Sequence, residues 1–218
     1  MEKGFWLERW KRQEIGFHQD EINPHLNRYW AELLPKPESE VFVPLCGKSR
    51  DMLWLRQQGH RVLGIELSAI AAQAFFDESG ITPQREGSEL FECYKSEGIR
   101  ILCGDFFDLR QSDLANIGAV YDRASLIALP PDMRERYAQH LMAILPPATQ
   151  ILLITLEYPQ HEMQGPPFAV TREEVEKLYG GHADVRLLAH LDVLAENPRF
   201  QERGLSQMME NIFLLRLQ

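Results

Sequence analysis

The chain has 218 residues, with 23 lysines and arginines against 32 aspartates and glutamates, so its formal net charge is −9 at pH 7. This length fits one domain, because open α/β domains often exceed the average of about 150 residues. The acidic balance, without any lysine- or arginine-rich run, argues against a nucleic-acid-binding protein. Apolar runs such as residues 151–156 are far shorter than the ~20 residues that span a bilayer, so we expect no membrane segment.

The N-terminal segment and the cysteines indicate a compartment. The segment is charged throughout and lacks the apolar region of a signal peptide. The three cysteines are an odd number and form no C-x-x-C pair. We therefore expect a cytoplasmic protein with reduced thiols. Nothing in the sequence requires a partner chain, so we also expect a monomer.

The first 35 residues precede the first predicted strand. Trp6, Trp10 and the segment 23–34 suggest two helices, which would either cap the sheet or form a lid over its carboxyl edge. From residue 40, apolar runs typical of buried strands alternate with helical segments. Strands are predicted at 40–45, 60–67, 99–107, 117–125 and 149–158, and helices at 50–59, 68–80, 130–145 and 171–180.

The last two predicted strands, 185–194 and 208–218, are joined by a segment too short for a helical crossover, which favours an antiparallel pair. The earlier strands are nearly continuous in apolar residues and separated by helices, which is typical of a parallel sheet covered on both faces. The predicted fold is a single α/β domain, residues 1–218. It contains a doubly wound, mostly parallel seven-stranded sheet with an antiparallel closing strand, and residues 1–35 form the helical cap or lid.

The turn after the first strand, PLCGKSRD at 44–51, is the expected ligand site, because ligands bind at the carboxyl ends of such strands. A phosphate-binding P-loop needs a glycine five positions before Gly47, and position 42 is Phe42. A dinucleotide fingerprint needs three glycines, and only one is present here. The turn therefore suits a ligand that lacks a pyrophosphate.

Glu66 ends the second predicted strand, nineteen residues after Gly47. A carboxylate there can accept hydrogen bonds from both hydroxyls of a ribose. On its own, Glu66 would be interpreted as a solvated residue at a strand end. Turn and spacing together favour nucleoside binding, and the single glycine favours S-adenosylmethionine over a dinucleotide.

Several sequence blocks carry a family resemblance. The segments FVPLCGKSRDMLWL, GHRVLGIELS, GDFFDL, IGAVYDRASLIAL and GPPFAV follow one another in order. Together they resemble the thiopurine S-methyltransferase family of bacterial type, and the resemblance covers essentially the whole chain. It implies a Rossmann-like fold and methyl transfer from S-adenosylmethionine to the sulfur of small aromatic or heterocyclic thiols such as thiopurines, with S-adenosylhomocysteine as product. Selenium or tellurium species are further acceptors that the resemblance suggests.

The resemblance also implies site residues. Cofactor contacts fall on Trp10, Leu45, Glu66, Asp105, Phe106 and Arg123, and acceptor contacts fall on Arg123 and Arg199. Phe106 fits core packing equally well, and Trp6 and Trp10 fit a hydrophobic seam at i, i+4. The alternative for Arg199 is a rim position in a hairpin loop, and the alternative for both Arg123 and Arg199 is an ion pair with a local acid such as Asp122 or Glu202.

The expected chemistry needs neither a metal nor a dedicated base. The seven histidines show no metal-ligand spacing, although His18 is a candidate for lining the lid. A sulfonium already activates its methyl group, so in-line attack by an anionic sulfur demands mainly alignment. Two alternatives remain open: a nucleoside-binding regulatory module without turnover, and methylation of a protein or nucleic acid.

Overall fold

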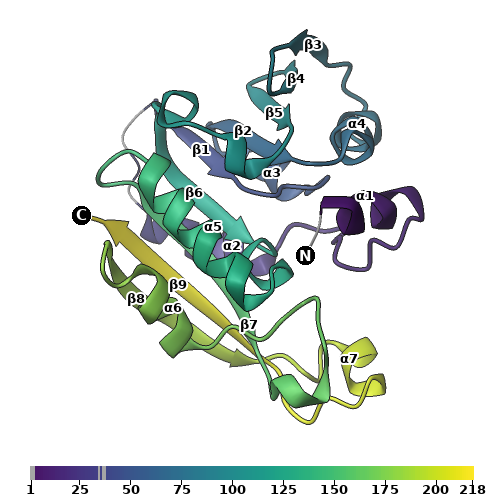
Figure 1. The fold of residues 1–218 in the computed structure, drawn as a ribbon, viewed down its shortest axis with the longest axis vertical. Helices are drawn as coiled ribbons and strands as arrows, with labels where there is room; N and C mark the ends of the chain where they lie inside the picture. The colour runs from purple at the N-terminus through teal and green to yellow at the C-terminus, as the bar shows by residue number, and fades with distance from the viewer. Residues whose placement is uncertain (1–2, 34, 36–37) are drawn as a thin grey trace.

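The computed structural model describes residues 3–33, 35 and 38–218, so residues 1–2 and 34 of the expected cap lie outside it. The described residues form one mixed sheet with the strand order β3-β4-β5-β2-β1-β6-β7-β9-β8 (Figure 1). The strands are β1 Glu40–Val43, β2 Arg61–Glu66, β3 Gln84–Gly87, β4 Glu92–Ser96, β5 Ile99–Cys103, β6 Ile117–Arg123, β7 Gln150–Glu157, β8 Ala183–Asp192 and β9 Met209–Leu217.

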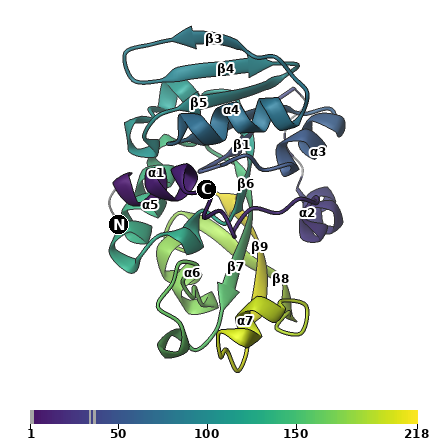
Figure 2. The same ribbon diagram turned by 90° about the vertical axis from the view of Figure 1, so that its right-hand side faces the viewer.

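The helices cover both faces of this sheet (Figures 1 and 2). They are α1 Lys3–Lys11, α2 Pro24–Tyr29, α3 Asp51–Gln57, α4 Ala69–Glu78, α5 Pro131–Ile144, α6 Arg172–Tyr179 and α7 Pro198–Glu202. In β1, Phe42 packs in the apolar cluster of α5 and α6, whereas Val41 and Val43 pack with α3 and α4. Neighbouring residues of a strand point to opposite faces, so β1 is buried on both sides, as in a doubly wound fold.

The parallel core of the prediction is confirmed. The strands β5, β2, β1, β6 and β7 pair in parallel. The last two strands form an antiparallel pair, and β9 also pairs antiparallel with β7. Each predicted helix between 50 and 180 is present, within two residues of the expected bounds at either end.

The predicted number of seven strands is wrong, because the sheet formed by the described residues has nine. The two missed strands, β3 and β4, form an antiparallel hairpin at the edge beside β5. All four residues of β3 are exposed, so this strand lacks the apolar run from which the other strands were recognised. The short helix α7 between β8 and β9 was missed as well, and the strand expected at 99–107 ends at Cys103.

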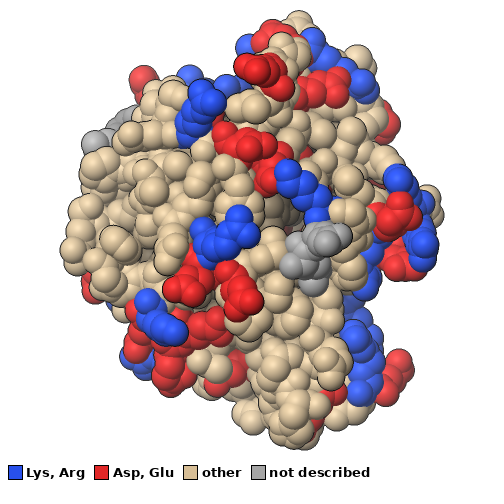
Figure 3. All heavy atoms as spheres, in the orientation of Figure 1, with Lys and Arg blue, Asp and Glu red and all other residues tan. Residues whose placement is uncertain are grey.

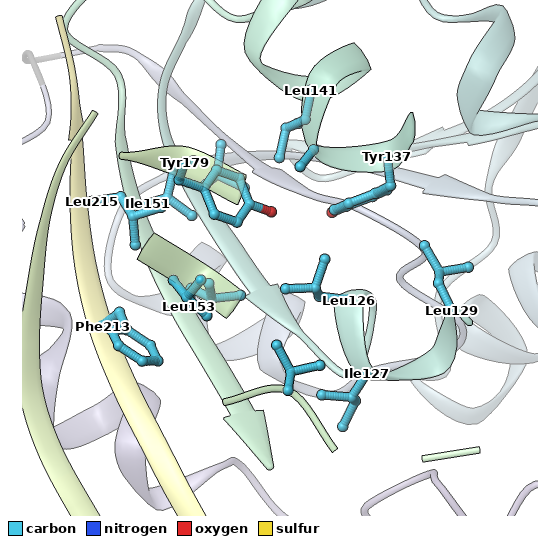
Figure 4. Close-up of a cluster of buried hydrophobic side chains, with 14 of the residues drawn as sticks. Leu126, Ile127, Leu129, Tyr137, Leu141, Ile151, Leu153, Tyr179, Phe213 and Leu215 are labelled. Atoms are coloured by element: carbon cyan, nitrogen blue, oxygen red, sulfur yellow. The ribbon is translucent and has the colours of Figure 1, made fainter. Parts of the chain in front are cut away.

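A buried polar group lies inside the core between β6, α5 and α6. The Tyr137 hydroxyl donates a 2.6 Å hydrogen bond to the Asp122 carboxylate, and both residues are fully buried. Figure 4 shows the hydroxyls of Tyr137 and Tyr179 pointing toward one another. Burial raises the pKa of Asp122 to about 6, since the apolar surroundings disfavour the charged form. The hydrogen bond from the Tyr137 hydroxyl therefore stabilises the Asp122 carboxyl group, whose burial is unfavourable.

Replacing Tyr137 with phenylalanine is expected to lower the free energy of unfolding by about 1–3 kcal/mol. The change removes only the hydroxyl and leaves the Asp122 oxygen without its donor. Urea denaturation of the two proteins measures the difference. Tyr29→Phe, at a partly exposed tyrosine on α2, is the matched control and is expected to change stability by less than about 0.5 kcal/mol. Equal stability of Tyr137→Phe and wild type would contradict the assigned role.

Candidate active site

One large cavity opens at the carboxyl ends of β1, β2 and β6 and has a volume of about 670 Å³. Helix α1 contributes to its lining, and this helix lies near α4 and α5 (Figure 2). All residues predicted for the site line this cavity: Trp10, Leu45, Glu66, Asp105, Phe106, Arg123 and Arg199. The structure thus brings together side chains that are up to 189 residues apart (Trp10 to Arg199). The volume of the cavity is within the range of about 300–1,000 Å³ typical of small-molecule sites.

Glu66 holds the turn that follows β1. Its Oε2 accepts a 2.8 Å hydrogen bond from the Gly47 amide, and its Oε1 accepts a 2.7 Å bond from the Ser68 amide. Burial raises the pKa of Glu66 to about 7, against the opposing effect of these amides. Each carboxylate oxygen keeps a second lone pair, so the group can still accept from two ligand hydroxyls.

The turn itself is conformationally unusual. Leu45 has a φ of 44° and Gly47 a φ of 53°, and Ala124, directly after Arg123, has a φ of 64°. Non-glycine residues adopt this region at a cost, and such residues cluster at ligand sites. A Cβ on Gly47 would lie 3.2 Å from the Trp10 ring, closer than ordinary van der Waals contact, so glycine lets Trp10 pack on the turn without being displaced.

The N-terminal segment closes the cavity with aromatic rings. Trp6 and Trp10 both pack edge-on against Phe17, each with ring centroids 5.6 Å apart, and all three line the cavity. Trp6 and Trp10 therefore form a hydrophobic seam with Phe17 and at the same time line the cavity. His18 also lines the cavity, and burial together with the nearby Lys48 lowers its pKa, which favours the neutral imidazole.

Asp105 and Phe106 occupy the side of the cavity beyond β5. Asp105 accepts from the Phe107 amide at 2.9 Å and forms a 2.5 Å ion pair with Lys3 of α1. Phe106 is 3% exposed and stacks on Tyr137 with ring centroids 4.6 Å apart. Phe106 thus packs in the core and also lines the cavity, so its cofactor contact stays a prediction.

Arg123 ends β6, and Arg199 lies on α7, the short helix between β8 and β9; both line the cavity. Arg199 donates to the carbonyl of Gly16, which connects α7 to the N-terminal segment. The alternative of an ion pair with Asp122 or Glu202 is wrong: within the described part of the chain, neither arginine pairs with an acid, and Asp122 bonds Tyr137 instead.

Other cavity residues were missed by sequence reasoning. Asp51 is buried and accepts from the Asn23 amide at 2.8 Å and from the Tyr121 hydroxyl at 3.0 Å. Its place in the first turn of α3, directly after the glycine turn, is a usable signal. Arg203 and Glu210 come from segments joined to the site only by the fold, and no local pattern marks them.

The residues that the structure describes offer neither a metal site nor a membrane span. Over residues 3–33, 35 and 38–218, no group of three or more histidine, cysteine, aspartate or glutamate residues is arranged to hold a metal ion. Every helix that these residues form is too short or too polar to serve as a membrane span. Figure 3 shows acidic and basic side chains intermingled over the face that carries α5 and α6.

The fold and site define a class of protein. The structure resembles a 1,6-didemethyltoxoflavin-N1-methyltransferase of Burkholderia thailandensis, solved with S-adenosylhomocysteine, with a TM-score of 0.66, 18% identity, and coverage of 99% of this chain and 86% of that one. It also resembles an S-adenosylmethionine-dependent methyltransferase of Anabaena variabilis, with a TM-score of 0.65, 15% identity, and coverage of 99% and 95%. The fold is therefore that of the Rossmann-like methyltransferases.

Sequence comparison identifies the family. The profile of the thiopurine S-methyltransferase family matches residues 1–218. The chain is 61% identical to the thiopurine S-methyltransferase of Nitrosospira multiformis, over 99% of this chain and 98% of that protein. It is 50% identical to the enzyme of the same name from Azotobacter vinelandii, over 99% of both. The chain belongs to the thiopurine S-methyltransferase family.

Proposed function

We propose that this protein transfers the methyl group of S-adenosylmethionine to the sulfur of small aromatic or heterocyclic thiols, thiopurines among them. The observation that carries the proposal is the pairing of Glu66 and the Gly47 turn, in one cavity, with Arg123 and Arg199. The first pair suits a nucleoside, and the two arginines suit an anionic acceptor. Family membership supports the same reaction.

The residues present fit S-adenosylmethionine. Glu66 would accept from the ribose hydroxyls with its free lone pairs, and Asp105 would accept from the adenine amine. Trp10 covers the turn at Leu45 and Gly47, which approaches the ligand through its backbone. When bound, S-adenosylmethionine supplies a sulfonium that makes its methyl group electrophilic.

The protein contributes positioning and electrostatics. The guanidinium groups of Arg123 and Arg199 would hold the acceptor sulfur and favour its ionised form, because an adjacent positive charge stabilises a thiolate. The aromatic cluster of Trp6, Trp10 and Phe17 keeps water from the cavity mouth. Alignment of two bound reactants accounts for an upper range of about 7–11 kcal/mol in rate enhancement.

Incubation with methyl-labelled S-adenosylmethionine and a panel of thiopurines, other thiols and selenite-derived species tests the proposal. Labelled methyl thioethers are the expected products, and labelled selenides would extend the acceptor range. Tight binding of S-adenosylhomocysteine without transfer to any acceptor would instead identify a regulatory module. The absence of both binding and transfer would overturn the cofactor assignment.

The N-terminal segment is expected to gain protection on ligand binding. We propose that residues 3–20 form a lid, since Trp10 packs on Gly47 and Arg199 bonds Gly16. Amide hydrogen exchange should therefore slow in this segment when S-adenosylhomocysteine is added. Strands β7 and β9 serve as the internal control and should not change. Equal exchange of residues 3–20 in both states would favour a permanent cap.

A further inference from the structure

Glu210 is an acid of the cavity to which the proposed methyl transfer gives no role. It is the second residue of β9 and lines the cavity with a side chain that is 20% exposed. Its Oε2 lies 2.6 Å from Nε2 of His25 on α2, and this contact holds the carboxylate in place. Its Oε1 makes no hydrogen bond to any residue that the structure describes, and this oxygen is not enclosed by protein. Glu210 therefore keeps one oxygen for a ligand.

The other acids of the cavity are committed. Asp51 accepts hydrogen bonds at both oxygens, from the Asn23 amide and from the Tyr121 hydroxyl. Asp105 and Glu14 are ion-paired with basic side chains of α1. Apart from the carboxylate that we assign to the ribose, Glu210 is thus the acid with a free oxygen among the described residues that line the cavity.

The strand order places Glu210 away from the proposed cofactor contacts. In the order β5-β2-β1-β6-β7-β9, the contacts at Gly47, Glu66 and Asp105 lie at the ends of β1, β2 and β5. Neighbouring strands are ~4.8 Å apart, so β9 lies about 14 Å from β1, on the far side of Arg123 at the end of β6. Glu210 therefore belongs to the part of the cavity that is left for the methyl acceptor.

The wall of the cavity around Glu210 is apolar. Leu156 pairs directly with Glu210 across β7 and β9, and Ile154 and Met208 line the cavity beside them. The flat ring of an aromatic acceptor suits such a wall, and a hydrogen bond in apolar surroundings is stronger than in water. An ionised carboxylate can only accept hydrogen bonds, so its partner on the acceptor has to be a donor. The donor that an aromatic heterocycle itself carries is a ring N–H.

We propose that Glu210 is a specificity-determining residue, whose free carboxylate oxygen accepts a hydrogen bond from a ring N–H of the methyl acceptor. A ring oxygen or sulfur at the same place would meet the lone pairs of the carboxylate and be repelled. The inference rests on the proposed methyl transfer and narrows its substrate class to heterocyclic thiols whose ring bears an N–H. His25 is a positioning residue, since it holds the other oxygen of the carboxylate.

Benzimidazole-2-thiol and benzoxazole-2-thiol test the inference, because they share one shape and differ in an N–H that is replaced by a ring oxygen. The ratio of variant to wild-type kcat/KM is compared for each acceptor, so that the different acidities of the two thiols cancel. Glu210→Gln should lower this ratio about 10-fold for the benzimidazole, as expected when a hydrogen bond to a charged group is lost. It should not lower the ratio for the benzoxazole, because the glutamine amide can donate to the ring oxygen.

Binding of each thiol to the complex with S-adenosylhomocysteine, measured by calorimetry, should show the same difference without turnover. Glu210→Asp keeps the charge but shortens the side chain, and it should also weaken the benzimidazole selectively. Glu135→Gln is the matched control, since it makes the same change at an exposed position of α5 outside the cavity lining, and it should leave both acceptors unchanged.

Equal losses for the two acceptors in both Glu210 variants would overturn the role of Glu210 and leave methyl transfer intact. Methylation of the benzoxazole alone by the wild type would overturn it as well. Failure of the wild type to methylate either thiol would count against the proposed function, and the calorimetric comparison would then still decide whether Glu210 recognises the N–H.

Discussion

Replacing Glu66 with alanine is expected to weaken binding of S-adenosylhomocysteine by about 1–3 kcal/mol, which corresponds to about 5- to 150-fold in Kd. The variant removes the proposed acceptor of both ribose hydroxyls. It also removes the partner of the Gly47 and Ser68 amides, which hold the turn after β1 and the start of α4. Isothermal titration calorimetry measures the change.

The pKa of Glu66 predicts that the affinity for S-adenosylhomocysteine depends on pH. In the ligand-free protein Glu66 has a pKa of about 7, and the ionised carboxylate accepts hydrogen bonds from two hydroxyls better than the protonated carboxyl does. At pH 6 only about a tenth of the protein is ionised at this position, whereas at pH 8 most of it is, so Kd should fall by up to about tenfold over this interval. The adjacent thiols of Cys46 and Cys103 do not confuse the result, since burial raises the pKa of both.

Two controls separate the ribose contact from a distorted turn. The slope of log Kd against pH should vanish in Glu66→Gln, which cannot ionise. An S-adenosylhomocysteine analogue without the 2′ and 3′ hydroxyls should bind wild type and Glu66→Ala with similar affinity. A variant that loses affinity equally for both ligands would show that Glu66 acts only through the turn.

The second large effect is expected for Arg123→Ala. Arg123 is placed at the end of β6, where the cavity holds both the methionine end of the cofactor and the acceptor in the proposed arrangement. Removal of its guanidinium should lower kcat/KM for an anionic thiol by about 100-fold, the size typical for loss of one preorganised donor at a developing or reacting charge. Affinity for S-adenosylhomocysteine should fall as well.

Arg199→Ala provides the contrast. Because Arg199 approaches from α7 on the acceptor side, its loss should raise KM or lower kcat and leave S-adenosylhomocysteine affinity nearly unchanged. Steady-state kinetics and calorimetry on the two variants measure both quantities. Normal acceptor kinetics in Arg123→Ala would remove that residue from the reaction, and weakened cofactor binding in Arg199→Ala would contradict the proposed division of roles.

The sequence by itself determined the parallel core, its helices and the part of the cavity where we propose that the cofactor binds. Buried strands such as 150–157 are continuous apolar runs, and a doubly wound sheet places its ligand at the carboxyl ends of those strands. Gly47 and Glu66 could be predicted because Gly47 lies in the turn after such a strand and Glu66 ends one. Arg123, Asp105 and Trp10 came from the blocks that resemble the family.

Only the tertiary structure decided the rest. The β3–β4 hairpin was invisible because an exposed edge strand needs no apolar run, and its place is set by pairing with β5. Arg199 and Gly16 are 183 residues apart in sequence, and only the fold brings α7 beside the N-terminal segment so that they form a hydrogen bond. No local sequence pattern predicts that charged residues far apart in the chain will line one cavity. The packing of the sheet, and not a local propensity, brings them together.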